Sequence, residues 1–248
     1  MGSEPTWQPL LDILNRMADT GRSARLWLRD DDAVEPTPAL ERLIDLTRQS
    51  GVSLSLAVIP AFTDKPLANR LGTEPHLSVA VHGWSHENHA AGQGKKRELS
   101  ADRPGTVVLD ELRAGFDKLL GLYQTQLDPV LVPPWNRIDA ALLPQLASIG
   151  FRAVSVYGEA NKAAIEQVNT HVDIMDWHGA RGCLPHAELV GLLVAELERR
   201  MAGSAEPVGL LTHHLVHDEA CWEFMARLFA VTAESKAVGW HRLGDLLA

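Results

Sequence analysis

The chain has 248 residues, of which 46% are hydrophobic and 22% are charged, so it can form a sizeable core and is not disordered, collagenous or a coiled coil. Its formal net charge of −9 argues against general binding to nucleic acid or to an anionic membrane. Two cysteines cannot form a disulfide framework and favour a reducing compartment, whereas the eleven histidines are unusually many and gather in short segments.

The N-terminal segment predicts an amphipathic helix. Trp7, Leu10, Leu11, Leu14 and Met17 repeat at helical spacing, and charged residues interrupt the segment. No apolar run here is typical of a secretory signal, and none elsewhere reaches the length of a membrane span. We therefore expect a cytoplasmic protein that has no membrane partner.

Short apolar runs alternate with amphipathic helical patterns along the rest of the chain. Strands are expected at Arg25–Arg29, Val52–Ile59, Leu77–Val81, Val130–Val132, Arg152–Val156, His171–Met175 and Val208–Thr212. Helices are expected at Pro38–Ser50, Val107–Leu127, Ala140–Ile149, Leu189–Met201 and Glu219–Thr232, before a closing segment at Val238–Leu247. The polar segment Ala90–Pro104 is typical of a functional or mobile loop.

This alternation predicts an α/β fold in which a parallel sheet is covered by helices. Seven or eight strand–helix units without a linker favour one barrel domain over residues 1–248. In such barrels the chemistry lies where the strands end, so the residues at those positions are the candidates for function.

The first predicted strand ends in Asp30, Asp31 and Asp32. Three adjacent carboxylates repel one another unless a cation or hydrogen-bond donors compensate. A solvated loop with a helix cap is the alternative interpretation of an acidic run.

The third predicted strand runs into His82, and His86 follows four residues later. Two imidazoles at this spacing on a helical turn lie on one side and can share a metal ion. With a carboxylate from the first strand they would leave coordination positions open, as catalytic zinc sites require.

Three further segments follow strands. Pro133 and Pro134 restrict the backbone, so that the amide of Trp135 can be aimed at a ligand. Trp177 can form the wall of a pocket, and a histidine at the end of Val208–Thr212 can act as a general acid. The remaining histidines without a partner in the sequence are interpreted as structural: His76, His171, His186 and His241.

Taken in order, these segments resemble the motifs of the NodB-type polysaccharide deacetylases (carbohydrate esterase family 4). The similar segments are Arg29–Ala33 for the paired aspartates, His82–His86 for His-(Ser/Thr)-x-x-His, Val132–Trp135 for Arg-x-Pro-Tyr, Asp173–Trp177 for the Asp-Trp motif and Gly209–His213 for Leu-x-Leu-x-His. They span residues 25–218, and five motifs in the family order are more specific than any one alone.

The resemblance implies a distorted (β/α) barrel of seven or eight strands and a divalent metal, usually zinc, with cobalt, nickel or manganese as alternatives. Carried over to this sequence, the metal ligands are Asp32, His82 and His86. The family's catalytic roles fall on Asp31 as base, the amide of Trp135 for the oxyanion, and His213 as the acid that protonates the departing amine. The expected substrate-binding residues are Trp84, Pro134, Asn136, Trp177 and His214.

Two assignments have alternatives one residue away. The pair Asp30 and Asp31 can replace Asp31 and Asp32, which we prefer, and His214 can replace His213. Successive side chains of a strand point to opposite faces, so one member of each pair serves.

The chain also departs from the family pattern. Gly83 replaces the Ser/Thr of the second motif, Trp135 replaces Tyr, and Val132 stands where the family has an arginine that orients the base. We expect Arg29 or Arg137 to supply that cation.

The resemblance implies removal of an acetyl or other acyl group from an N-acylated sugar or saccharide conjugate. The substrate would be a small molecule or an oligosaccharide. The alternatives are a metal-dependent amidohydrolase of non-carbohydrate amides and an inactive barrel that binds saccharide through Trp84, Trp135 and Trp177.

Overall fold

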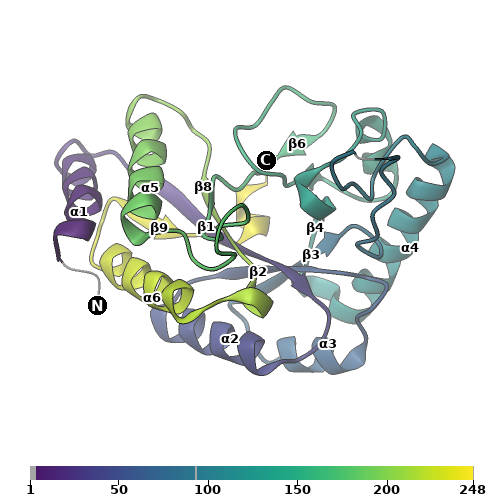
Figure 1. Cartoon of the computed structure of the whole chain (residues 1–248), viewed down its shortest axis with the longest axis horizontal. Helices are drawn as coiled ribbons and strands as arrows, with labels where there is room; N and C mark the ends of the chain where they lie inside the picture. The colour runs from purple at the N-terminus through teal and green to yellow at the C-terminus, as the bar shows by residue number, and fades with distance from the viewer. Residues whose placement is uncertain (1–3, 93, 248) are drawn as a thin grey trace.

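The computed structural model describes residues 4–92 and 94–247 and consists of parallel strands surrounded by helices (Figure 1). The strands are β1 (Ala24–Ala33), β2 (Leu54–Val58), β3 (Leu77–His82), β4 (Leu127–Val132), β5 (Ala153–Val154), β6 (Glu166–Gln167), β7 (Val172–Asp173), β8 (Val208–Thr212) and β9 (Val238–Trp240). The α-helices are α1 (Glu4–Asp19), α2 (Pro38–Ser50), α3 (Lys65–Leu71), α4 (Gly105–Tyr123), α5 (His186–Met201) and α6 (Glu219–Ala233). The 3-10 helices are η1 (Gln124–Gln126), η2 (Pro134–Asn136), η3 (Leu143–Ser148), η4 (His214–Val216) and η5 (Leu243–Leu246).

The strands form one curled sheet. Hydrogen-bonded neighbours follow the order β6-β5-β4-β3-β2-β1-β8-β7, and β9 pairs with β1. All of these pairs are parallel, and the connections between most of them pass through helices on the outer side of the sheet (Figure 1). The predicted α/β barrel is therefore confirmed, in a distorted form that leaves β6 and β7 at the two ends of the sheet.

Strand alternation divides the core into an outer and an inner layer. In β1, Leu26 and Leu28 belong to the large apolar cluster between sheet and helices, whereas Trp27 points to a smaller cluster inside the barrel. Leu243 and Leu246 of η5 complete the inner cluster, so the C-terminal segment closes one end of the barrel. At the other end, where the strands finish, the buried side chains include Arg29, Asp31 and His82.

The N-terminal helix and the second helix agree with their predictions. Trp7 and Met17 are buried on the inner face of α1, which packs against α5. Helix α2 has the predicted bounds because Thr37 caps its first turn, accepting from the amide of Leu40 at 3.1 Å, and Gly51 ends it at φ +65°. None of the described helices is long and apolar enough to cross a membrane.

The structure corrects several predicted boundaries. Strand β1 continues through the acidic residues to Ala33 instead of ending at Arg29. The predicted helix Val107–Leu127 ends at Tyr123, because Gln124 takes φ +49° and the chain then enters β4. Helix α3 and strand β6 are additional elements that the apolar pattern did not predict.

Other predicted elements are shorter or different in type. Ala140–Ile149 forms the 3-10 helix η3 instead of an α-helix, in keeping with Pro144 near its start, which supplies no backbone N–H. The strands predicted at Arg152–Val156 and His171–Met175 shorten to β5 and β7, which have two residues each. Within Ala90–Pro104, Gln93 lies outside the described residues.

Gly209 in β8 packs directly against the inner core and provides a test of it. A Cβ atom at this position would lie 2.5 Å from Nε1 of Trp27 and 2.7 Å from the carbonyl oxygen of Asn169. We expect Gly209→Ala to lower the free energy of unfolding by about 1–3 kcal/mol, measured by chemical denaturation. Gly191→Ala is the control, because a Cβ there meets nothing within 4 Å in α5 and should stabilise by up to about 1 kcal/mol. Equal stability of the two variants would contradict this packing.

Candidate metal centre

The ends of β1 and β3 bring the acidic residues and the histidines together inside the barrel. Along β3, Ala80 lies in the inner apolar cluster, so His82, two residues later, faces the same side. Along β1, Trp27 faces inward, and alternation places Arg29 and Asp31 on that same side. The strand pattern thus directs three polar side chains to one end of the barrel.

Asp32 joins this group because the strand loses its regularity there. The register between β1 and β2 shifts between Asp30 and Ala33, and Asp32 takes φ +73°. Its Oδ1 lies 3.2 Å from Nε2 of His82 and 3.3 Å from Nε2 of His86. The ligand atoms of the three residues lie within 4.8 Å of one another, so the predicted trio converges.

The hydrogen bonds and pKa shifts of Asp32, His82 and His86 are compatible with binding of a cation by these three residues. Nδ1 of His82 donates to the carbonyl of Val132 at 2.9 Å, so Nε2 is the nitrogen that faces Asp32 and that would bind a cation after losing its proton. Burial opposes ionisation of Asp32, but the hydrogen bond and charge of His82 outweigh it and hold the pKa of this carboxyl well below its usual range. Burial, with the neighbouring His82, lowers the pKa of His86 and favours its neutral form. An anionic oxygen and two imidazole nitrogens fit a divalent metal such as zinc.

A second group of potential ligands, formed by Cys183, Asp218 and Cys221, serves as a helix cap. Oδ1 of Asp218 accepts from the amide of Cys221 at 2.9 Å, and Oδ2 accepts from the amide of Cys183 at 3.1 Å. Both carboxylate oxygens of Asp218 are therefore engaged by backbone amides, one at the start of α6 and one at Cys183, before α5.

A buried arginine holds the carboxylate next to the trio. Nε of Arg29 lies 2.9 Å from Oδ1 of Asp31, and Nη2 donates to Oδ2 at 3.1 Å. The same guanidinium donates to Oγ of Ser155 at 2.8 Å and to Oδ1 of Asn136 at 2.7 Å. Of the two cations predicted to compensate for Val132, Arg29 is the one beside Asp31, since Arg137 donates to the carbonyl of Lys96.

Asp30 and His214 lie on the opposite side of the sheet from this centre. Oδ1 of Asp30 contacts Nδ1 of His214 in a buried ion pair, and Oδ2 accepts from Oγ1 of Thr212 at 2.7 Å. Although burial opposes both charges, the partner raises the pKa of His214 and lowers that of Asp30. This placement favours Asp31 and Asp32 over Asp30 and Asp31 as the pair that faces the centre, and it favours His213 over His214 as the candidate acid. The prediction that His214 binds substrate is not supported, because its side chain lies on the other side of the sheet.

His213 lies beside Asp31 at the edge of the centre. Its Nε2 lies 4.0 Å from Oδ2 of Asp31, and its ring meets that of Trp177 edge-on at 4.7 Å. Nε1 of Trp177 donates at 2.8 Å to Asp173, whose pKa is raised by burial. The segment that resembles the fourth motif therefore supports the predicted acid.

The loop after β4 approaches the trio through a strained backbone. Trp135 and Asn136 take φ +54° and +55°, a region that residues with a Cβ rarely adopt. The ring of Trp135 lies 4.3 Å from that of His86. Pro134 is buried against Gly83, so the two prolines hold this loop beside the histidines.

Glu98 is a buried residue of the site that sequence reasoning missed. It is fully buried, and its Oε1 accepts from the amides of Trp84 and Ser85 at 3.1 and 2.7 Å. A Cβ on Gly83, which has φ +57°, would lie 2.1 Å from its Oε2. Glu98 thus supports the loop between the two histidines and occupies the space beside the residue where the family motif has Ser/Thr.

Trp84, predicted to bind substrate, is half-buried and is held through its backbone, because its carbonyl accepts from the amide of Ala61 at 2.9 Å.

The role of Glu98 has no signal in the sequence, because this residue lies in a polar loop among charged residues. The replacement of Ser/Thr by Gly83 indicates that some other group supports this turn, but it does not identify that group as Glu98.

The register of the acidic residues can be tested by comparing two isosteric variants. Asp30→Asn should lower the free energy of unfolding by about 3–5 kcal/mol, because a charged His214 stays buried, while metal binding is retained. Asp32→Asn should lower zinc affinity by about 100-fold or more, because a ligand is lost. Zinc affinity is measured by chelator competition, and stability by denaturation. Loss of zinc binding in Asp30→Asn would reverse the assignment.

The support given by Glu98 can be tested in the same assay. Removing it leaves two backbone amides of the histidine loop without their acceptor, so Glu98→Ala should weaken zinc affinity by about 10–100-fold. The matched control is Glu87→Ala in the same loop, where the side chain is 67% exposed and zinc affinity should not change. If both variants bind zinc equally well, Glu98 does not position the ligands.

Comparisons with known proteins place the fold. No protein-family model matches the chain, and neither does any curated protein. Among solved structures, a candidate polysaccharide deacetylase from Mycobacterium smegmatis matches with a TM-score of 0.68 at 15% identity, over 91% of this chain and 89% of the other. A family 4 carbohydrate esterase from Streptomyces lividans, in complex with acetate, matches with a TM-score of 0.58 at 14% identity, over 89% and 93% of the two chains.

A family 4 acetyl xylan esterase from Clostridium thermocellum, in complex with a cobalt ion, matches with a TM-score of 0.56 at 15% identity over 90% of this chain and 89% of the other. These likenesses extend over nearly the whole chain, although few residues are identical. The chain therefore has the NodB-type polysaccharide deacetylase fold, which confirms at the level of the fold the resemblance predicted from its motifs.

Proposed function

We propose that this chain is a metal-dependent N-deacetylase of acylated sugars. The observation that carries the proposal is the convergence of Asp32, His82 and His86, next to Asp31 and His213, whose side chains lie 4.0 Å apart. The names of the structural neighbours, which include deacetylases and esterases of carbohydrates, support the same reaction class. The bond that would break is the C–N bond of the amide that joins the acyl group to the sugar.

Asp32, His82 and His86 would hold the metal, and zinc is our first choice because one carboxylate and two imidazoles are typical of its catalytic sites. Such an ion, when bound, supplies Lewis-acid activation of water and of an acyl carbonyl. The Val132 carbonyl fixes the tautomer of His82, so that this ligand needs no rearrangement.

Asp31 would act as the general base that removes a proton from the attacking water. The paired contacts from Arg29 fix both of its oxygens and compensate the charge of a carboxylate that is only 3% exposed. A base held in this way can accept a proton without losing its orientation.

His213 would protonate the departing amine as the C–N bond breaks. Its Nε2 lies 4.0 Å from Oδ2 of Asp31, and its ring packs edge-on against the ring of Trp177. The amide of Trp135 would donate to the oxyanion, because the two preceding prolines and the positive φ of Trp135 fix its direction.

The role of the base can be tested with Asp31→Asn. We expect this variant to keep zinc binding and to lose about 100-fold or more in kcat for acetate release from N-acetylglucosamine oligomers, because an amide cannot accept the proton. Zinc content is measured by elemental analysis and acetate by mass spectrometry. Asp110→Asn, on the exposed face of α4, is the matched control and should retain wild-type activity.

Undiminished acetate release by Asp31→Asn would show that another group is the base. A zinc-loaded wild-type protein that releases no acetate from any acetylated sugar would overturn the deacetylase proposal and favour a barrel that only binds saccharide.

A further inference from the structure

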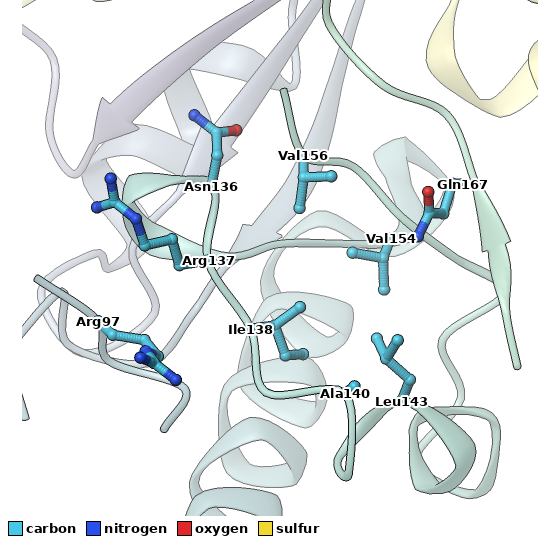
Figure 2. Close-up of a pocket in the computed structure, with 9 residues that line it drawn as sticks. All are labelled: Arg97, Asn136, Arg137, Ile138, Ala140, Leu143, Val154, Val156 and Gln167. Carbon is cyan, nitrogen blue, oxygen red and sulfur yellow. The ribbon is translucent and has the colours of Figure 1, made fainter. Parts of the chain in front are cut away.

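Figure 2 shows a pocket of about 350 Å³ that lies apart from the metal centre. Its apolar wall includes Val154, which belongs to the cluster between the sheet and the outer helices, and Ile138 and Leu143, which pack on that cluster. His82 faces the inner side of the barrel, so this apolar wall and the centre lie on opposite sides of the sheet. The two cysteines form a different feature, which has chemistry of its own.

The cysteines are brought together by a carboxylate that both backbones share. Asp218 accepts from the amide of Cys221 at 2.9 Å through Oδ1 and from the amide of Cys183 at 3.1 Å through Oδ2. Cys183 is also paired with Met175 in an antiparallel bridge, which fixes its segment beside the first turn of α6. The two sulfur atoms and the carboxylate lie within 4.8 Å of one another, although the cysteines are far apart in the sequence.

The two thiols have unequal surroundings. Cys221 is fully buried, with its Sγ 3.7 Å from Sδ of Met175, whereas Cys183 is partly exposed. A hydrogen bond with the Cys221 thiol lowers the pKa of Cys183, and the same contact, together with burial, raises the pKa of Cys221. The accessible thiol is therefore the better nucleophile, and the buried thiol stays protonated beside it.

The surroundings favour thiol chemistry over metal binding at this group. Structural zinc sites take four ligands, and among the described residues no further His, Cys, Asp or Glu joins Cys183, Asp218 and Cys221. Both oxygens of Asp218 already accept from backbone amides. What remains is a pair of adjacent thiols, one accessible and one buried, which is the arrangement that thiol–disulfide exchange requires.

We propose that Cys183 and Cys221 form a site of reversible oxidation by low-molecular-weight disulfides, in which Cys183 reacts first and Cys221 resolves. The Cys183 thiolate attacks a disulfide RSSR, forms a mixed disulfide and releases one RS⁻. Cys221 then attacks the sulfur of Cys183 and displaces a second RS⁻, and the two protons of the protein thiols end on the two RSH molecules. The protein loses two electrons, which RSSR gains.

The bond would join the segment that carries Trp177 to the first turn of α6. Trp177 lies between Met175 and Cys183, which are paired with each other, and Cys221 belongs to α6. The residues of this site have no role in the proposed deacetylation, so the inference stands independently of the proposed function.

The test exposes the folded, full-length protein to glutathione disulfide and analyses it by intact mass spectrometry and peptide mapping. We expect the chain to lose two hydrogen atoms, with the peptides of Cys183 and Cys221 joined, and we expect dithiothreitol to restore both thiols. Met175→Leu is the matched control, because it keeps a similar volume beside Cys221 and should allow the same bond to form.

Single variants distinguish the two thiols. Cys221→Ala should accumulate glutathione on Cys183, because the resolving thiol is gone. Cys183→Ser should lower the rate of modification by about tenfold or more, because the remaining thiol is buried. Circular dichroism verifies that each variant is folded.

A mixed disulfide that persists in the wild type, or a bond between two chains in place of one within the chain, would overturn the site. Modification of Cys183→Ser as fast as the wild type would do the same. Folded wild-type protein that stays reduced, under conditions in which the urea-denatured chain is oxidised, would show that the two cysteines only pack against each other.

Discussion

The alternation of side chains along β1 is the constraint on which the site depends. Trp27, Arg29 and Asp31 share the inner face of the barrel, and Asp30 shares the outer face with Leu28. One change of register at the end of the strand then turns the next carboxylate toward the histidines of β3. Three adjacent carboxylates therefore meet three different partners: a buried histidine, a buried arginine and the pair of imidazoles. Their mutual repulsion is offset by these separate environments.

Buried polar groups at this end of the barrel are linked to one another, although Oε2 of Glu98 and Nδ1 of His213 have no hydrogen-bond partner among the described residues. Arg29 is fully buried and contacts four side-chain or backbone partners, so it links Asp31, the proposed base, to the loop that follows β4. Glu98 is equally buried, and its acceptor oxygen is used by backbone amides of the histidine loop. Removing one partner from such a group leaves the other without compensation, which is why the site and the stability of its surroundings are linked.

The residues of the proposed centre lie both on rigid strand ends and on the loops that follow them. The proposed metal ligands and base come from β1, β3 and the turn that follows β3, and the sheet holds these strands at fixed separations. The amide proposed for the oxyanion, that of Trp135, belongs to η2 after β4. Loops tolerate substitution better than the strands they connect, so the same barrel can keep its reaction and change its substrate.

Local patterns in the sequence determined the α/β alternation, the bounds of α2 and β8, and the strand ends that supply the centre, because periodicity and strand-end position are local properties. They left open whether Asp30 or Asp31 faces the centre and whether Arg29 or Arg137 compensates it. Those choices depend on the direction of side chains relative to a neighbouring strand, as do the contacts of Glu98 with a loop 13 residues before it in the chain. Only the tertiary structure decides them, since hydrogen bonds and burial between distant segments exist only once the sheet has formed.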